Sequence, residues 1–381
     1  MTIGVLKEVS PETRVSILPE HLEMLKKWEV NVIVENNAGV KAFAENEKYE
    51  EAGATIVSRD ELFKSSDIIL GMDAEGIDPN NVGSKILTGN FHSLYNTHFI
   101  HECAERQATI FSLEMLPRTT RAQSMDILSS QANIAGYKAV VLAANLFPRY
   151  FPMFMTAAGS IAPAKVLILG AGVAGLQAIA TARRLGGVVE VFDTRPEVKE
   201  EVMSLGAKFV EVEGAADASL AGGYAVDQTE EFLGKQKAKI AERVARADII
   251  ITTAQIPGRK APILITEEML QGMKNGSVII DLAADTGGNT SRTKSAETIK
   301  YKGISIVGNS RLAATMPYDA SKLYGKNVLN FLQLIISEDG SLNLNFEDDL
   351  VKGACVVHAG EITNEKVKEN VYYDLLKKSD L

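Results

Sequence analysis

The chain has 381 residues, of which 46% are hydrophobic and 23% charged, a mixture typical of a folded protein with room for two domain cores. The net charge of −9 and the lack of any lysine- and arginine-rich run argue against a nucleic-acid partner. The two cysteines, Cys103 and Cys355, are too few and too far apart in sequence for a disulfide framework, a zinc site or a CxxC redox motif.

The most apolar stretch of the chain, residues 166–180, is interrupted by glycines and Gln177 and is shorter than the roughly 20 residues of a membrane span. We therefore expect no direct membrane span. The first residues, Met1 to Val5, lack the basic and apolar regions of a signal peptide and instead predict a strand. Together with the few cysteines, this start favours a cytoplasmic protein.

The first third of the chain alternates short β-branched runs with helical patterns, which predicts βαβ units and a parallel sheet with helices on both faces. Residues 19–25 form the first predicted helix, because Leu22 and Leu25 recur at helical spacing. Strands are predicted at residues 3–6, 31–35, 54–57, 67–70, 85–88 and 108–112.

A second alternation begins at Lys165 and matches a doubly wound dinucleotide-binding fold. Helices are predicted from about Val173, near residues 196–205 and over residues 230–246. Strands are predicted at residues 166–169, 188–192, 209–212, 249–252, 278–281 and 304–307.

A glycine pattern opens this second block, where a buried strand runs into Gly-x-Gly-x-x-Gly and then a helix. Gly170 makes the tight turn, Gly172 lets a pyrophosphate approach the backbone, and Gly175 lets helix and strand pack closely. The helix start, at Val173 and Ala174, offers free N–H donors and partial positive charge to the phosphates. The structural alternative is a bare tight turn, but strand, glycines and helix together predict a dinucleotide site.

An acidic residue, Asp193, follows at the end of the next predicted strand. A carboxylate at this place accepts hydrogen bonds from the adenosine ribose and repels a 2′-phosphate, so the sequence favours NAD(H) over NADP(H). Arg195 complicates this interpretation, because an arginine just beyond the acid can meet a phosphate. We interpret Arg195 as a surface residue or as packing on the adenine edge.

The domain organisation follows from two long helical patterns, residues 133–146 and 322–336, that flank the second block, the latter with Asp319 or Ser321 as its N-cap. Such helices would carry the chain into and out of the second domain. The last ~35 residues carry no definite pattern. We predict an α/β fold of two doubly wound Rossmann-like domains, with an NAD-binding domain at residues 133–318 inserted in a discontinuous domain at residues 1–132 and 319–381.

Several of these segments resemble the alanine dehydrogenase and transhydrogenase superfamily. The segments shared with the whole superfamily are IGVLKE at 3–8, ETRV at 12–15, AQIPG at 254–258 and GSVIID at 276–281. The segments that resemble the transhydrogenase branch are RTTRAQSMDILSSQ at 118–131, GGYA at 222–225 and KNVLNF at 326–331. The resemblance runs from residue 3 to beyond residue 350.

The resemblance implies that Arg118, Gln123, Asp126 and Ser129 belong to a loop that holds the nicotinamide end of NAD(H). A carboxamide needs paired donors and acceptors, which Gln123 and Ser129 supply, while Arg118 and Asp126 can form an ion pair that fixes the loop. The structural alternative is an ordinary helix start with Ser124 or Asp126 as the N-cap.

Two further cofactor contacts are implied by the resemblance. Residues 213–229, rich in glycine and alanine with Tyr224 at the centre, are similar to the mobile loop that closes over nucleotide in transhydrogenases. The alternative is a plain surface loop in which Tyr224 contacts nothing. Gln255, within AQIPG, is the other implied contact.

The alanine dehydrogenase branch is the main alternative, because Arg14, His92 and Asp285 fall where that branch is expected to hold its substrate. The lysine expected after the strand at 67–70 is missing, since the sequence there reads Gly-Met-Asp. A dehydrogenase must move a proton as well as a hydride, whereas hydride passage between two nicotinamides needs no acid or base. A structural role for His92 is the ordinary interpretation.

The resemblance therefore implies hydride transfer between NAD(H) on this chain and NADP(H) on a partner component. It also implies a membrane-spanning component that moves protons, a homodimer, and a peripheral position on the cytoplasmic face of the inner membrane. No histidine spacing predicts a metal site, and His98 and His101 beside Cys103 do not change this. A non-enzymatic NAD-sensing or scaffold module is the second alternative.

Overall fold

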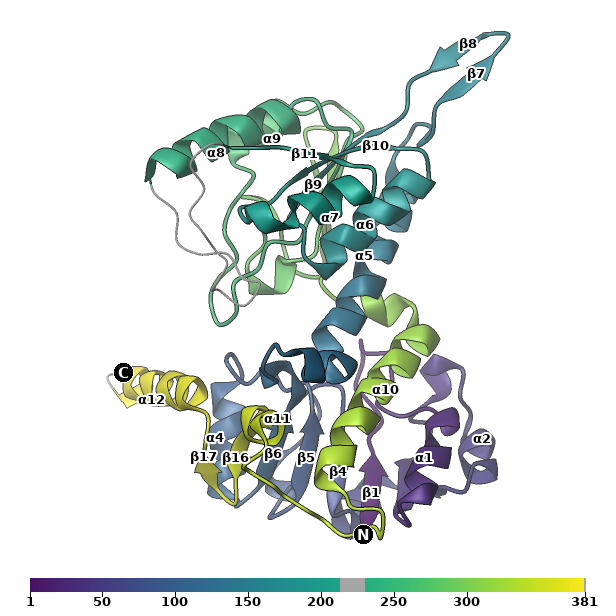
Figure 1. The fold of residues 1–381 in the computed structure, drawn as a ribbon, viewed down its shortest axis with the longest axis vertical. Coiled ribbons are helices and arrows are strands. Elements are labelled where there is room, and N and C mark those ends of the chain that lie inside the picture. The colour runs from purple at the N-terminus through teal and green to yellow at the C-terminus, as the bar shows by residue number, and fades with distance from the viewer. Residues whose placement is uncertain (213–229, 380–381) are drawn as a thin grey trace. The chain divides into compact units, whose positions relative to one another are not determined.

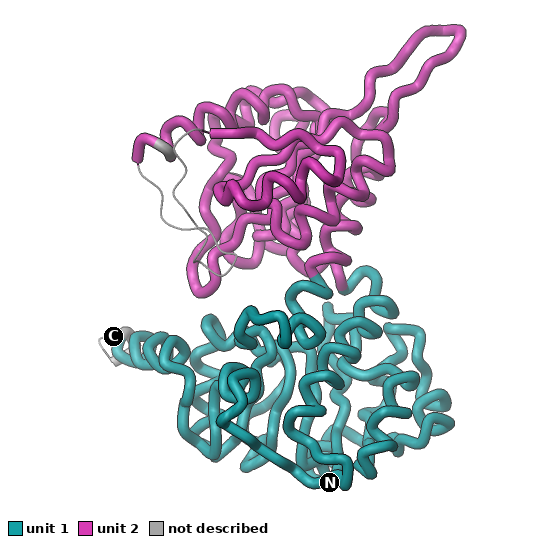
Figure 2. The backbone as a smooth tube through the Cα atoms, viewed as in Figure 1, with its two compact units in different colours: residues 1–131, 314–381 teal, residues 132–313 magenta. Residues whose placement is uncertain are grey.

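The computed structural model describes residues 1–212 and 230–379, and the chain divides into two compact units. Unit 1 comprises residues 1–131 and 314–381, and unit 2 comprises residues 132–313 (Figure 2). Each unit has a mainly parallel sheet with helices packed against it (Figure 1). The predicted α/β class with two domains is confirmed.

The sheet of unit 1 has, within the described residues, eight strands in the order β17-β16-β6-β5-β4-β1-β2-β3 (Figure 1). Strands β1 to β6 run parallel, and β16 and β17 add an antiparallel edge. The six strands predicted in the first third are confirmed, within the one or two residues by which element boundaries vary. The bounds are β1 (Thr2–Val5), β2 (Asn31–Glu35), β3 (Thr55–Val57), β4 (Ile68–Leu70), β5 (Ile86–Gly89), β6 (Thr109–Ser112), β16 (Cys355–His358) and β17 (Glu361–Ile362).

Both faces of this sheet are buried, as expected for a parallel sheet covered by helices. In β4, Ile68 and Leu70 pack into one hydrophobic cluster while Ile69 packs into another. This alternation arises because successive side chains of a strand point to opposite faces. The helices of unit 1 are α1 (Leu22–Lys27), α2 (Asn46–Glu51), α3 (Arg59–Ser65), α4 (Thr97–Glu105), α10 (Pro317–Ile335), α11 (Asp349–Ala354) and α12 (Glu365–Ser379).

The sheet of unit 2 has, in the part that the structure describes, seven strands in the order β11-β10-β9-β12-β13-β15-β14. All neighbours are parallel except the antiparallel edge strand β14, which was not predicted because its five residues, Glu-Thr-Ile-Lys-Tyr, are mostly polar and mostly solvent-exposed. The strand predicted at 209–212 is wrong in extent, because only Lys208 and Phe209 pair with β10. The bounds are β9 (Lys165–Leu169), β10 (Val188–Phe192), β11 (Lys208–Phe209), β12 (Ile249–Thr252), β13 (Val278–Asp281), β14 (Glu297–Tyr301) and β15 (Ile304–Gly308).

The helices of unit 2 connect these strands and cover the sheet (Figure 1). α6 directly follows β9 and packs against β9 and β10, which is the crossover expected of a doubly wound fold. The helices are α5 (Ile127–Leu146), which begins in unit 1, α6 (Val173–Arg184), α7 (Lys199–Ser204), α8 (Glu230–Val244) and α9 (Glu267–Gln271).

Both long flanking helices begin earlier than predicted. α5 begins at Ile127, directly after Asp126, whose carboxylate accepts a hydrogen bond from the Ser129 N–H. α10 begins at Pro317, and the predicted caps Asp319 and Ser321 both lie inside the helix. A proline suits the first helical position, because its fixed φ is helical and it lacks an N–H that would be unpaired there.

A short hairpin in unit 2 was not predicted. Its strands β7 (Phe154–Thr156) and β8 (Gly159–Ile161) pair antiparallel between α5 and β9, and the hairpin projects from the body of its unit (Figure 2). Met153 and Met155 are 62% and 76% exposed. In the described part of the chain, no helix has both the length and the apolar character to span a membrane.

Candidate functional site

The glycine loop lies at the carboxyl end of β9, in unit 2. Gly170 has a φ of +106°, a left-handed conformation that favours glycine, and its N–H donates to the Phe192 carbonyl at 2.8 Å. A β-carbon on Gly175 would lie 2.0 Å from the Gly170 carbonyl oxygen, so strand and helix meet with no room for a side chain. A β-carbon on Gly172 would meet nothing within 4 Å, so the loop is open at the point where a phosphate would approach.

The N-terminus of α6 directly follows this open position. Gly172 is the N-cap residue and provides no side-chain hydrogen bond to the first amides of the helix, which include Val173 and Ala174. Unpaired N–H groups at a helix start, with the partial positive charge of the helix dipole, bind anions. The residues present therefore fit the pyrophosphate of a dinucleotide.

The Asp193 carboxylate lies beside this loop, after the end of β10. Its Oδ2 accepts a hydrogen bond from the Ala171 N–H at 2.7 Å, which ties the acid to the glycine loop. Arg195 completes the set, with its backbone N–H and Nε on Oδ1 at 2.9 and 3.0 Å and its Nη2 on Oδ2 at 2.9 Å. The hydrogen bond to Asp193 raises the pKa of Arg195 above its ordinary value.

This pairing corrects the interpretation of Arg195 as a surface residue, while its packing on an adenine edge stays a prediction. Its side chain is only 17% exposed and folds back onto the acid two residues before it. A carboxylate has about four acceptor positions, and the four bonds from Ala171 and Arg195 occupy them. Asp193 can bind a ribose only by releasing one of these donors.

The segment around Gln255 lies at the same edge of the sheet as the glycine loop. The Thr253 N–H donates to the Leu169 carbonyl at 2.9 Å, and Thr253 Oγ1 donates to the Gly170 carbonyl at 3.1 Å. Gln255 is exposed, and its Nε2 donates to the Leu282 carbonyl at 3.1 Å. The structure therefore places Gln255, a predicted cofactor contact, in the loop beside the glycine loop, within unit 2.

Asn289 is a buried residue of this edge that the sequence analysis missed. Its side chain donates to the carbonyls of Ala254 and Pro262 at 2.8 and 2.9 Å and accepts from the Ala254 N–H at 3.1 Å. Its own N–H donates to the buried Asp281 carboxylate at 2.7 Å. Asn289 thus fixes the loop that carries Gln255, and the Gly-Gly pair directly before it is a sequence signal that could have drawn attention to it.

The predicted nicotinamide loop belongs to unit 1. Arg118 is exposed just before a 3₁₀ turn at Thr120–Met125, and Gln123 is exposed within that turn. Asp126 accepts from the Ser129 N–H at 2.9 Å and from Ser129 Oγ at 2.6 Å, so Asp126 is the helix cap that the alternative interpretation expected. The Ser129 hydroxyl therefore gives its proton to Asp126 and keeps its lone pairs as acceptors.

Arg14 is held close to this loop by two partners within unit 1. Its guanidinium donates to both oxygens of Glu12 at 2.8 and 2.7 Å and to Gln131 Oε1 at 2.8 Å. Burial alone would raise the pKa of Glu12, but the hydrogen bonds and charge of Arg14 outweigh it and lower that pKa to about 2. Arg14 is thus already paired with a carboxylate of its own chain.

A second buried acid, Glu8, lies at the end of β1. Its Oε1 accepts from the Met72 N–H at 2.7 Å, and Tyr324 donates to the neighbouring Gly71 carbonyl at 2.9 Å. Burial raises the pKa of Glu8 to about 8, although the bond from Met72 opposes the shift. Glu8 is therefore mostly protonated at neutral pH.

The other two residues of the dehydrogenase alternative have ordinary structural surroundings. His92 is exposed with a φ of +49°, and its carbonyl accepts from the amides of Tyr95 and Asn96, which directly precede α4. Asp285 is 41% exposed, accepts from Ser295 Oγ and lies 3.8 Å from the Arg311 guanidinium. Neither shows the pairing of a positioned acid and base.

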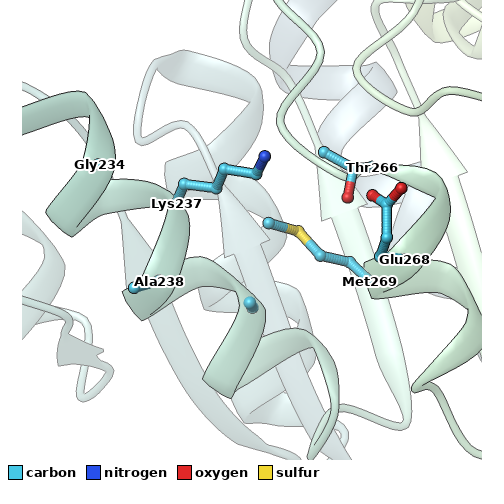
Figure 3. A pocket seen from close by; sticks show the side chains of 7 residues that line it. Gly234, Lys237, Ala238, Thr266, Glu268 and Met269 are labelled. Carbon is cyan, nitrogen blue, oxygen red and sulfur yellow. The ribbon is translucent and has the colours of Figure 1, made fainter. Parts of the chain in front are cut away.

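A groove of about 400 Å³ lies between α8 and α9, and none of the predicted site residues lines it. It is lined by Gly234, Lys237, Ala238 and Ala241 of α8 and by Thr266, Glu268 and Met269 (Figure 3). Among the described residues, no three His, Cys, Asp or Glu side chains come together as metal ligands. Tyr224 lies outside the described residues.

Two family models match this chain. The alanine dehydrogenase/PNT N-terminal domain matches residues 4–135, and the alanine dehydrogenase/PNT C-terminal domain matches residues 139–365. Together they cover both units described above.

Individual relatives separate the two branches. A Rhodospirillum rubrum protein, named as the first part of the NAD(P) transhydrogenase subunit alpha, is 44% identical over 96% of this chain and 98% of its own. The NAD(P) transhydrogenase subunit alpha of Cereibacter sphaeroides is 43% identical over 95% of this chain and 71% of its own. An alanine dehydrogenase of Staphylococcus saprophyticus is 25% identical over 97% of this chain and 96% of its own.

A solved structure described as the transhydrogenase from Sinorhizobium meliloti gives the same result. It is 42% identical and superposes with a TM-score of 0.86. The match covers 95% of this chain and 100% of that structure's chain. The chain therefore belongs to the alanine dehydrogenase/PNT family and, within it, to the group of NAD(P) transhydrogenase alpha subunits.

Proposed function

We propose that this chain is the NAD(H)-binding part of a transhydrogenase and passes hydride between NAD(H) and NADP(H) held on a partner component. The observation that carries the proposal is the open glycine loop with Asp193 bonded to it, in a chain of the transhydrogenase alpha-subunit group. When bound, NADH supplies the hydride. The residues of this chain bind and orient the nucleotide.

The adenosine and pyrophosphate end is held by unit 2. The amides at the start of α6, near Val173 and Ala174, bind the phosphates, and Gly172 leaves the space that they need. Asp193 accepts from the ribose hydroxyls after Arg195 has released part of the carboxylate. Gln255 contacts the nucleotide from the neighbouring loop at the same sheet edge.

The nicotinamide end is held by unit 1. The exposed Gln123 amide offers a donor and an acceptor to the carboxamide, and Ser129 offers an acceptor because its proton goes to Asp126. Arg118 and Asp126 fix the loop on either side of Gln123. These four residues increase the rate by positioning the nicotinamide, because a hydride moves only between well-aligned rings.

Hydride transfer between two nicotinamides needs no acid or base from the protein. The pairing of Arg14 in unit 1 is consistent with such a reaction. Three of the five N–H groups of the Arg14 guanidinium donate to Glu12 and Gln131, and the Glu12 carboxylate balances its charge, so Arg14 is less available to a substrate carboxylate. This supports the transhydrogenase assignment over an amino-acid dehydrogenase.

The proposal includes two partners and a second copy. The NADP(H) component receives the hydride, and a membrane-spanning component moves protons while this chain sits on the cytoplasmic face of the inner membrane. The Rhodospirillum rubrum relative is named as only the first part of a subunit alpha, which supports the existence of further components. The projecting β7–β8 hairpin, with exposed Met153 and Met155, supports a homodimer, because exposed apolar side chains favour burial against a partner.

The test is reduction of an NAD⁺ analogue by NADPH, using the purified chain with and without the soluble NADP(H)-binding component of a transhydrogenase. A parallel assay supplies pyruvate, ammonia and NADH to the chain alone. We expect turnover only when the component is added. Pyruvate-dependent oxidation of NADH by the chain alone would instead establish the amino-acid dehydrogenase.

A further inference from the structure

Two asparagines of α10 hold one carbonyl of the turn that carries Gln123. Asn327 Nδ2 and Asn330 Nδ2 each donate to the Ser124 carbonyl oxygen at 2.8 Å. Ser124 directly follows Gln123, and all four residues belong to unit 1. These asparagines are the two amides of the KNVLNF segment, for which the proposed function gives no role.

The turn depends on these two bonds more than an ordinary turn would. It is a 3₁₀ segment, Thr120–Met125, whose internal hydrogen bonds are of poorer geometry than those of an α-helix. Ala122 and Met125 are buried on its inner side, so the exposed Gln123 between them has its backbone fixed from both directions. A carbonyl that accepts two donors is held in orientation as well as in position.

The cost of placing Asn327 at this point supports a specific role. The residue is 8% exposed, and among the described residues its Oδ1 is a buried acceptor without a hydrogen-bond partner. A buried acceptor without a hydrogen-bond partner destabilises a fold, so an apolar residue of similar size would pack better there. What only an amide supplies is the N–H that reaches Ser124.

Another polar contact of the turn is weaker. Arg121 pairs with Asp348, the N-cap residue of α11, and with Asp349, but its side chain is 51% exposed. Exposed ion pairs contribute little to stability, because water and salt screen the two charges. The two asparagine bonds are therefore the main polar restraint on the orientation of Gln123.

We infer that Asn327 and Asn330 are positioning residues for hydride transfer, which act by fixing the peptide after Gln123 and so the direction of its side-chain amide toward a nicotinamide carboxamide. This inference rests on the proposed function. A misdirected Gln123 still permits nucleotide binding through the glycine loop, so the effect falls on the rate at saturating NADH.

The test uses Asn330→Ala and Asn330→Asp, because aspartate keeps the shape of the side chain but has no donor. We would measure NADH affinity from the nucleotide's own fluorescence and the single-turnover hydride rate with the NADP(H) component. We expect at least a tenfold loss of rate with NADH affinity changed by less than about twofold. Gln333→Ala is the matched control, because this exposed α10 amide donates to the Met24 sulfur at 3.5 Å rather than to the turn, and we expect no change.

Amide hydrogen exchange over residues 120–126, measured in the chain alone, tests whether the asparagine bonds to Ser124 hold the turn. This test does not depend on the proposed function. We expect faster exchange there in both Asn330 variants and wild-type exchange in Gln333→Ala. Unchanged exchange, or an unchanged hydride rate with faster exchange, would overturn the inference. If the wild-type chain transfers no hydride with its partner, the proposed function fails, and a positioning role in that reaction fails with it. The exchange experiment then still shows whether the asparagine bonds hold the turn.

Discussion

Arg195 donates three hydrogen bonds to the Asp193 carboxylate, one from its backbone and two from its guanidinium, while Ala171 donates the fourth. The residue chosen to bind the ribose is therefore saturated by its own chain. Two residues of opposite charge, two positions apart, thus decide together how an adenosine ribose, with or without a 2′-phosphate, is bound.

Replacement of Arg195 by alanine frees two acceptor positions of Asp193 and leaves its negative charge unbalanced. We expect NADH to bind more tightly, by roughly 1 kcal/mol or about fivefold, and NADPH to bind more weakly. Fluorescence titration with both nucleotides measures the change. A loss of NADH affinity would show instead that Arg195 contacts the nucleotide directly.

Replacement of Asp193 by alanine removes the ribose acceptor and releases the Arg195 guanidinium. We expect NADH binding to weaken by roughly 1–3 kcal/mol, the scale of a lost charge-assisted hydrogen bond. The preference for NADH over NADPH should narrow, because a free arginine can meet a 2′-phosphate. Unchanged NADH affinity in the same titration would remove Asp193 from the site.

Gly172 and Gly175 offer a matched pair of alanine substitutions in one loop. A β-carbon at 175 would lie 2.0 Å from a backbone oxygen, so Gly175→Ala should destabilise the fold by about 1–3 kcal/mol. A β-carbon at 172 meets nothing within 4 Å, so Gly172→Ala should keep its stability and lose nucleotide affinity. Denaturant unfolding and NADH titration of both variants check this; equal stability losses would contradict it.

Replacement of Gln123 by alanine removes the proposed carboxamide contact from an exposed side chain. We expect the hydride rate with the NADP(H) component to fall by more than the NADH affinity, because the contact orients the ring. Single-turnover rates and equilibrium titration supply the two numbers. Parallel losses in both would make Gln123 an affinity contact only.

Glu8 makes the stability of the chain depend on pH. Its pKa is raised from 4.5 to about 8 in the folded chain, so folding retains a proton that the unfolded chain releases between these values. The stabilisation is complete below about pH 4.5 and is lost as the pH rises through about 8. Glu8→Gln carries no such proton, and amide oxygen still accepts from Met72.

We therefore expect the free energy of unfolding of Glu8→Gln, relative to wild type, to increase between about pH 5 and pH 8 by an amount on the order of a few kcal/mol. Urea unfolding at several pH values measures this difference. Two curves that stay parallel across the range would mean that burial does not hold the proton on Glu8.

The sequence alone determined most parallel strands and the dinucleotide loop. These strands and the start of α6 follow from local patterns of apolar residues and from glycines whose role depends on the few residues around them, whereas the edge strands β14, β16 and β17 were not predicted. The resemblance also named the residues of the nicotinamide loop.

The tertiary structure decided how those residues are held. Ser124 accepts from Asn327 and Asn330, Arg14 donates to Gln131, and β16 pairs with β6, contacts between segments far apart in the chain. No local pattern encodes such pairs, because side-chain partners depend on how elements pack rather than on spacing. Even the Asp193–Arg195 pair, close in sequence, depends on a side-chain direction that only the folded loop sets.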